Sequence, residues 1–262
     1  MSEEFNEKEI RDLMEKLSKK RPVFDSEDDF KFSLAWEIKE KYKDDLEIIL
    51  EKKMNNKNAS GSEECDHKNK NQRIDIFIKV KNENDMEKIG IELKYYTAKI
   101  EWQDNRNDET FILASQYAND IKCYDAWKDV ERLENFIDKG FINKGFVIWL
   151  TNVNSLTKDC IDIENENKNT AYYDEFRICN KRIINGPKKM DWKKTKKTPS
   201  KGTIKGREKP ITIKGNYKVY WKEYKDLSNE QKNINEKSSN KKNSNKVFKY
   251  AILEVQKKAE EG

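Results

Sequence analysis

The sequence predicts a mixed α/β protein with a central mixed β-sheet flanked by helices, and three features predict it. Two apolar runs at residues 73–80 and 88–97 alternate with period two, and a polar, turn-like segment joins them as in a hairpin. A long segment of helical periodicity ends at Gly140. The almost continuous apolar run at 145–152 follows, as expected of a strand buried on both faces in the middle of a sheet.

The composition bounds the class of protein. The 262 residues allow one large domain or two small ones, and 39% charged against 35% hydrophobic residues indicate a heavily solvated chain that still has a core. No apolar run approaches the roughly 20 residues that span a bilayer. The acidic N-terminus does not resemble a signal peptide. We therefore expect a cytoplasmic location and no membrane partner.

Rare residue types restrict the chemistry. The four cysteines, Cys65, Cys123, Cys160 and Cys179, form no C-x-x-C pair, which predicts reduced thiols. His67 is the only histidine, so His-based triads are excluded and a zinc site is disfavoured. Carboxylates, lysine and a hard metal ion remain as the candidate chemistry.

Two helices are predicted before the first strand. Residues 1–20 show helical spacing of apolar side chains, and Arg21-Pro22 interrupts the pattern. A second helix begins at Ser26, a good N-cap, with Asp29 completing a loose capping box. The apolar positions are Phe5, Ile10, Leu13, Met14 and Leu17 in the first helix and Phe30, Leu34, Ile38 and Tyr42 in the second.

The remaining elements follow in order. Residues 45–50 are predicted as the first strand and 52–71 as a loop. After the hairpin, 100–110 is polar and predicted as a loop, and a long helix runs from Phe111 to Gly140. Its buried side is expected to be Tyr117, Ile121, Tyr124, Trp127, Val130, Leu133 and Ile137. Residues near 228–246 are of low complexity and predicted to be disordered.

Three polar side chains share one face of the predicted hairpin. Asp75 points away from its isoleucine neighbours, and Glu92 and Lys94 point away from Ile91 and Leu93. Pairing the two strands with their apolar faces inward brings the three to one surface patch. Two carboxylates with waters and a substrate phosphate suffice for Mg²⁺, beside a lysine that acts as general base or stabilises charge. The alternative is the ordinary charged solvent face of a hairpin.

An Asp on one strand and Glu-X-Lys on the next resembles the PD-(D/E)XK nuclease superfamily, the restriction-endonuclease-like fold. Here the motif is Asp75 with Glu92-Leu93-Lys94, and Ile74 replaces the usual proline. The predicted order of elements, αβββαβ, agrees with that core. Segments 21–38, 91–97, 124–134 and 145–152 are similar to an uncharacterised prokaryotic family with this core, whose C-terminal part supplies further strands, here 211–224 and 247–255.

The resemblance implies a Mg²⁺-dependent DNA endonuclease, with Mn²⁺ able to substitute, and a role in restriction or phage defence is compatible with it. Asp75, Glu92 and the Leu93 carbonyl would hold the metal, and Lys94 would orient water and offset developing charge. In this superfamily the first core helix often adds a glutamate. Glu27 fits that position best, and Glu37 is the competing candidate. The alternative role for Glu27 is that of a first-turn acid that complements the helix dipole. Gln116 is a candidate for orienting substrate or water.

Charge is distributed unevenly along the chain. The net charge is +5, but residues 1–180 carry 30 basic and 40 acidic residues, whereas 181–262 carry 24 and 9. We therefore divide the chain into a catalytic core, 1–180, and a basic extension, 181–262, whose strands pack on the same domain. The extension is expected to contact phosphates, unless it is merely a solvated lysine-rich loop. The candidate contacts are Lys188, Lys189, Lys193, Lys194, Lys196, Lys197 and Arg207.

The expected partner is DNA, and RNA stays open because nothing in the sequence distinguishes the sugars. Cutting both strands of a duplex commonly needs two sites, which a homodimer would supply. The first alternative is a nucleic-acid-binding protein with the nuclease fold and no turnover. A protein–protein adaptor with a lysine-rich tail is the second.

Overall fold

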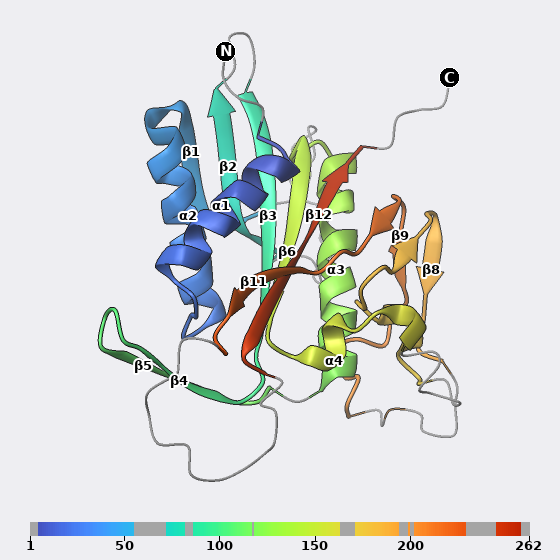
Figure 1. Ribbon diagram of the computed structural model, residues 1–262. Helices are drawn as coiled ribbons and strands as arrows, with labels where there is room; N and C mark the ends of the chain where they lie inside the picture. The colour runs from blue at the N-terminus through green and yellow to red at the C-terminus, as the bar shows by residue number, and fades with distance from the viewer. Residues whose placement is uncertain are drawn as a thin grey trace.

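A six-stranded mixed sheet forms the centre of the computed structural model, which describes residues 5–54, 72–81, 86–116, 118–162, 171–193, 199, 202–228 and 245–257 (Figure 1). β3 and β6 run parallel, and the other neighbouring strands are antiparallel. The strand order across the sheet is β1 (Leu46–Lys53), β2 (Arg73–Lys81), β3 (Met86–Tyr96), β6 (Lys144–Thr151), β12 (Val247–Gln256) and β11 (Lys222–Asp226). The predicted mixed α/β class is confirmed at this level.

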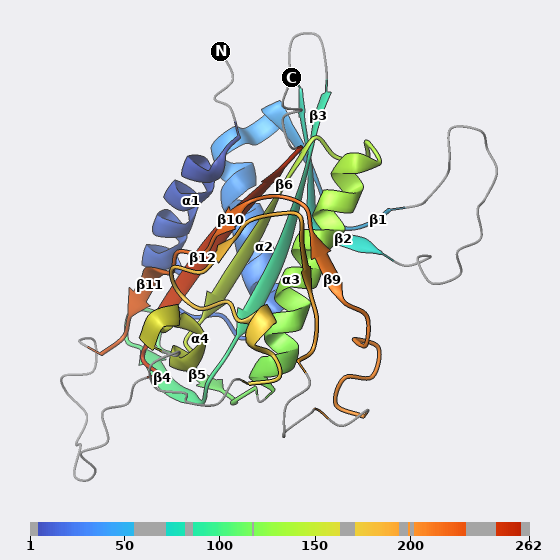
Figure 2. The same ribbon diagram turned by 90° about the vertical axis from the view of Figure 1, so that its right-hand side faces the viewer.

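Helices cover both faces of the sheet. α1 (Glu7–Lys20) and α2 (Glu27–Tyr42) lie on one face and α3 (Asn119–Asp138) lies on the other (Figure 2). Ser26 caps α2 as predicted, because its Oγ accepts from the Asp29 amide at 3.0 Å. Asp29 reaches back to the amide of Asp25 at 3.0 Å rather than to Ser26, so the capping box is displaced by one residue. Short helical turns occur at η1 (Lys43–Asp45), α4 (Asn154–Thr157) and η2 (Asp174–Phe176).

β6 is buried on both faces, as its apolar run predicts. Phe146 and Ile148 belong to the core beneath α1 and α2, whereas Val147 and Trp149 pack in the core beneath α3. The strand is flanked by β3 on one side and β12 on the other. β6 is therefore the strand around which both cores form.

A second hairpin corrects two predictions. β4 (Ile100–Asp104) and β5 (Glu109–Leu113) pair antiparallel, so the segment predicted as a loop is a hairpin. Its buried rings, Trp102 and Phe111, stack with centroids 5.8 Å apart. The predicted helix start at Phe111 was wrong, because α3 begins at Asn119, after Ala118 in the left-handed region (φ 70°). The helix ends as predicted, before Gly140 at φ 69°.

The C-terminal part forms short strands rather than one long strand at 211–224. β9 (Ile211–Ile213) pairs with β8 (Lys188–Met190), and β10 (Tyr217–Lys218) pairs with β7 (Ile183–Ile184). Of the described strands in this part, only β11 and β12 join the main sheet. Most of the segment predicted to be disordered, 229–244, lies outside the described residues, as does most of the loop predicted at 52–71.

Cys160 and Cys179 form a disulfide with a Cα–Cα distance of 5.2 Å, so the prediction of reduced thiols was wrong for this pair. A β-bridge between Asp159 and Asn180 brings the two cysteines together without a C-x-x-C motif. Cys123 is a free, buried thiol, and Cys65 and His67 lie outside the described residues. In the described part of the chain, no helix has the length and apolar character needed to cross a membrane.

Candidate functional site

The candidate site lies where β2 and β3 separate. The two strands pair from Lys81 and Met86 as far as Ile76 and Ile91, and β3 then continues alongside β6 alone. Asp75, the next residue of β2, accepts a hydrogen bond from the Leu93 amide through Oδ2 at 2.8 Å. Beyond the last β2–β3 pair, the Leu93 amide of β3 therefore binds a side-chain oxygen instead of a backbone carbonyl of β2.

Glu27 reaches the same edge of β3 from the first turn of α2. Its Oε2 accepts from the Tyr95 amide at 2.9 Å, two residues beyond the amide that Asp75 binds. Its Oε1 lies 4.0 Å from Nζ of Lys94. Two carboxylates from different elements therefore line one strand edge.

Lys94 lies between these carboxylates and α3. Its Nζ is 2.8 Å from Oδ2 of Asp129 and donates to the Leu93 carbonyl at 3.0 Å. The side chain is 18% exposed, and Asp129 is buried. Lys94 is thus held by its own strand and by a partner on α3.

Glu92 is fully buried under α3, at 1% exposure, and is paired with Arg132. Nε of Arg132 donates to Oε1 of Glu92 at 3.0 Å, and its Nη2 donates to Oε2. The same guanidinium lies 2.9 Å from Oδ1 of Asp129. We call the six charged side chains the β3 cluster: Glu27, Asp75, Glu92, Lys94, Asp129 and Arg132.

The expectation of an exposed patch was wrong for this cluster. The face of the hairpin that carries Glu92 and Lys94 packs against α3, and Ile74 and Phe77 of the same sheet lie in that core. The sequence shows the alternation along each strand, but the coverage of the second face depends on the crossover helix. The cluster is therefore open to solvent mainly beside Glu27, whose side chain is 42% exposed.

Burial and like charge shift the titration of the cluster. Burial raises the pKa of Glu27, and it raises the pKa of Glu92 well above its usual range although Arg132 opposes the shift. Burial alone would lower the pKa of Lys94, but the charges of Asp129 and Glu27 outweigh it, so that pKa lies above its usual value. Lys94 therefore carries its positive charge at neutral pH.

Four carboxylates and two cations give the fully ionised cluster a formal charge of −2. Comparisons with protein-family models, with curated proteins and with solved structures found no match.

The oxygen donors of the cluster have the chemistry that Mg²⁺ prefers. Within the described residues, however, no three His, Cys, Asp or Glu side chains are already grouped to hold a metal ion. Asp75, Glu27 and the Leu93 carbonyl meet at the strand edge, whereas Glu92 is engaged by Arg132. The residues fit a cation at the edge, and Glu92 could join it only by leaving Arg132.

The structure distinguishes between Glu27 and Glu37, the two glutamates of α2 that were candidates for the site. Glu37 lies 2.9 Å from Nζ of Lys16 and also pairs with Lys20, both on α1. Glu27 is the one that the fold brings to the cluster. Gln116 is exposed and precedes α3, and its Oε1 accepts from the Thr97 amide at 3.5 Å, so the described contacts do not connect it to the cluster.

The candidate phosphate contacts that the structure describes lie on or near the β8–β9 pair, of which β9 packs on α3. Lys188 and Lys189 belong to β8, and Lys193 follows it. Arg207 forms a two-point ion pair with Asp125, at 2.6 and 2.7 Å, and therefore already has an internal partner. Lys194, Lys196 and Lys197 lie outside the described residues.

Asp129 and Arg132 were missed by the sequence reasoning. With Asp125 they are spaced by four and three residues, so they share a stripe on α3. This stripe adjoins the predicted apolar side, which contains Val130 and Leu133. Charged residues bordering the buried face of a crossover helix were the available signal.

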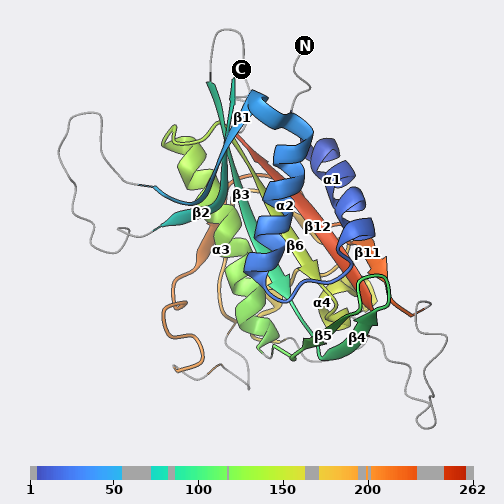
Figure 3. The same cartoon turned by 90° about the vertical axis from the view of Figure 1, so that its left-hand side faces the viewer.

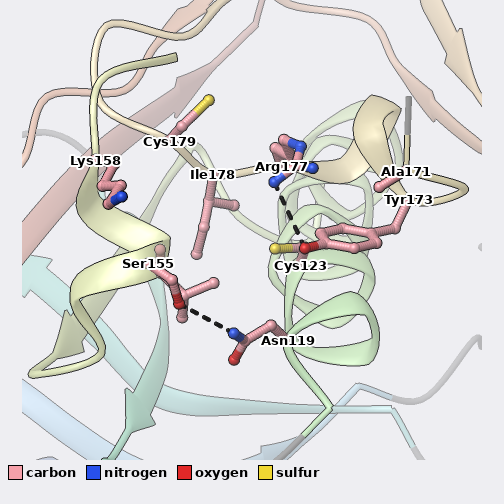
Figure 4. Close-up of a pocket in the computed structure, with 10 residues that line it drawn as sticks. Asn119, Cys123, Ser155, Lys158, Ala171, Tyr173, Arg177, Ile178 and Cys179 are labelled. Carbon is pink, nitrogen blue, oxygen red and sulfur yellow. Dashed lines mark hydrogen bonds between the residues drawn. The ribbon is translucent and has the colours of Figure 1, made fainter. Parts of the chain in front are cut away.

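A cavity of about 280 Å³ lies between the start of α3, α4 and the segment around Arg177 (Figure 4). The polar side chains in its wall bind one another: Asn119 donates to Ser155 at 3.1 Å, and Arg177 donates to the hydroxyl of Tyr173 at 3.5 Å. The thiol of Cys123 also lines it, and burial raises its pKa to about 12. None of the predicted site residues lines this cavity.

Proposed function

We propose that the protein is a Mg²⁺-dependent nuclease with a restriction-endonuclease-like core, acting on DNA as an endonuclease. The observation that carries the proposal is the convergence of Asp75, Glu92 and Lys94 where β2 and β3 separate, with Glu27 joining from α2. Buried charged groups with shifted pKa values concentrate at functional sites, which is why this set supports the proposal.

The order of elements supports the same proposal. α2 precedes the antiparallel strands β1, β2 and β3, then α3 crosses over, and β6 returns parallel to β3. This is the αβββαβ order of the resemblance, with the β4–β5 hairpin inserted. The short sheets and β11 and β12 are additions to it.

The metal would be held by oxygen atoms of Asp75, Glu27 and the Leu93 carbonyl, and by Glu92 once Arg132 releases it. A divalent cation would offset the formal charge of −2. When bound, it supplies Lewis-acid polarisation of the scissile phosphate and a more acidic bound water. Mn²⁺ has the same ligand preference and is proposed to substitute.

Lys94 contributes charge rather than proton abstraction. Because its ammonium is fixed between Asp129 and the strand edge, it can orient the attacking water and offset charge on the phosphorane. A preorganised donor of this kind lowers the activation barrier by about 3 kcal/mol.

A second candidate is supported by the pairing of Arg132 with Glu92. A chain in which that pairing persists would bind nucleic acid without turnover, because one proposed metal ligand stays neutralised. Under either proposal, backbone phosphates are met by the basic extension, through Lys188, Lys189 and Lys193, with Lys194, Lys196, Lys197 and Arg207 as further proposed contacts. RNA is kept as an alternative substrate.

The test is cleavage of supercoiled plasmid with Mg²⁺, Mn²⁺ or EDTA. Wild type should nick or linearise the plasmid only with metal, and Asp75→Ala and Lys94→Ala should cut it at least about 10²-fold more slowly. Lys88→Ala, on the same strand six residues before Lys94, is the matched control and should cut normally. Lys94→Ala cutting at the wild-type rate would refute the role of that amine. A gel shift that survives EDTA without cutting would support the binding protein, and neither shift nor cutting would reject DNA.

A further inference from the structure

α2 carries large apolar side chains on two opposite faces. Phe30 and Leu34 are fully buried against the sheet, whereas Phe32 and Trp36 are 56% and 66% exposed. Figure 3 shows α2 as an outer helix, with α1 beside it. A helix that covers one core normally has a polar outer face, so two adjacent exposed aromatic side chains indicate a further contact.

The outer face of α2 also has an ordered distribution of charge. Acidic residues lie at its N-terminal end, the aromatic pair lies in the middle, and lysines lie at its C-terminal end. Successive positions are four, three, four, three and four residues apart. The four within α2 therefore share one face of the helix, whereas Asp25 precedes the N-cap and Lys43 is the C-cap residue. We call them the α2 stripe: Asp25, Asp29, Phe32, Trp36, Lys39 and Lys43.

This stripe is complementary to itself in the antiparallel direction. A two-fold axis midway between Phe32 and Trp36 sets Phe32 against Trp36 of a second copy. The same axis sets Asp29, which also pairs with Arg21 of its own chain, against the second copy's Lys39. It brings Asp25 near the second copy's Lys43, both exposed and just beyond the helix ends. Self-complementarity is the requirement for an isologous contact. Nucleic acid fits the stripe less well, since its acidic half would repel phosphates.

We propose that the α2 stripe is the interface of a symmetric dimer of this chain, with the two α2 helices antiparallel. One helix pair is a small contact, so the dimer dissociates on dilution. The two Glu27 residues would lie about 20 Å apart along the helix direction, from their 14-residue separation in register. The interface stands independently of nuclease activity.

The first experiment measures the mass of the full chain by sedimentation equilibrium over a range of concentrations. Wild type should show reversible dimerisation, and Trp36→Ala and Phe32→Ala should each raise the dissociation constant at least about tenfold, as for a central aromatic anchor. Ile112→Ala is the matched control, because Ile112 is 72% exposed on β5. A monomer at every concentration, or dimerisation unchanged in Trp36→Ala, would overturn the proposal.

The second experiment tests the pairing by charge reversal. Asp25→Lys and Lys43→Glu each place like charges across the axis and should weaken dimerisation. An equal mixture of the two variants restores both opposite-charge contacts and should form heterodimers at near wild-type affinity. Asp25 precedes the N-cap and Lys43 follows the helix, so both variants keep the core intact, which thermal melting checks. A mixture that associates no better than either variant alone would refute the antiparallel register.

Discussion

Arg132 of α3 binds Glu92 of β3 through two hydrogen bonds, and the carboxylate that it binds is 1% exposed. The guanidinium also contacts Asp129, which in turn pairs with Lys94. Arg132 thus balances the buried charge of Glu92 and fixes Asp129, the partner of the proposed catalytic Lys94.

Arg132→Ala should lower the free energy of unfolding by about 3 kcal/mol in EDTA, because it leaves a buried carboxylate without its cation. Lys128→Ala removes an exposed cation on the same helix, whose partner Glu131 keeps a hydrogen bond from the Thr212 amide, and should change the free energy of unfolding by less than about 1 kcal/mol. Urea unfolding measures both. Added Mg²⁺ should restore more stability to Arg132→Ala than to wild type, since Glu92 then requires another cation. Equal effects of Mg²⁺ would contradict a metal role for Glu92.

Lys94→Ala should slow plasmid cleavage by about 10²–10³-fold, the usual effect of losing one preorganised donor. DNA affinity, measured by gel shift in EDTA, should persist because the basic extension is unchanged. Single-turnover cleavage separates the two effects. A parallel loss of binding and cleavage would mean that Lys94 holds substrate rather than the transition state.

Glu27→Ala and Glu37→Ala should have opposite consequences. Removing Glu27 should reduce cleavage and metal affinity with little change in stability, since its side chain is 42% exposed. Removing Glu37 should leave cleavage intact but weaken α1–α2 packing by about 1 kcal/mol, because Lys16 and Lys20 lose their partner. Cleavage assays and urea unfolding of both variants decide the matter. Loss of cleavage in Glu37→Ala alone would reverse the assignment.

The cluster should also make metal-free stability depend on pH in an unusual direction. Burial raises the pKa of Glu27 and Glu92 in the folded chain, so both bind protons on folding at pH values above the ordinary glutamate pKa. The stabilising contribution of each group is complete below the ordinary glutamate pKa. It is lost as the pH rises through the higher pKa that the group has in the folded chain.

Other carboxyls act oppositely, since ion pairs and hydrogen bonds lower the pKa of Glu9, Asp104 and Asp159. The informative quantity is therefore the difference between wild type and Glu27→Gln, measured by urea unfolding in EDTA. As the pH rises from about 4 to 7, the free energy of unfolding of Glu27→Gln should increase relative to that of wild type. A difference that is constant with pH would show that Glu27 does not gain a proton on folding.

Elements with a strong local signal were predictable from the sequence. The Ser26 cap, the Gly140 stop and the apolar run of β6 each depend on neighbouring residues, and each was confirmed. The hairpin of β2 and β3 was also predictable, because its alternation sets the register and hence the convergence of Asp75, Glu92 and Lys94.

Features set by tertiary contacts were not predictable in the same way. The apolar run Phe111-Ile112-Leu113 is too short for its period to distinguish strand from helix, and pairing with β4 decides it. The pairing of Cys160 with Cys179 depends on a bridge between distant segments. The contacts of Asp129 and Arg132 depend on how α3 is rotated above the sheet, which the one-dimensional pattern does not specify.

The place of β12 beside β6 has a consequence for synthesis on the ribosome. β6 is apolar on both faces, and about one hundred residues separate it from the strand that completes its hydrogen bonding. Until residues 247–256 have left the exit tunnel, the nascent chain presents a long unpaired apolar strand, the kind of edge that promotes aggregation. Such distant pairing also slows folding. The protein should therefore depend on chaperones until residues 247–256 have emerged.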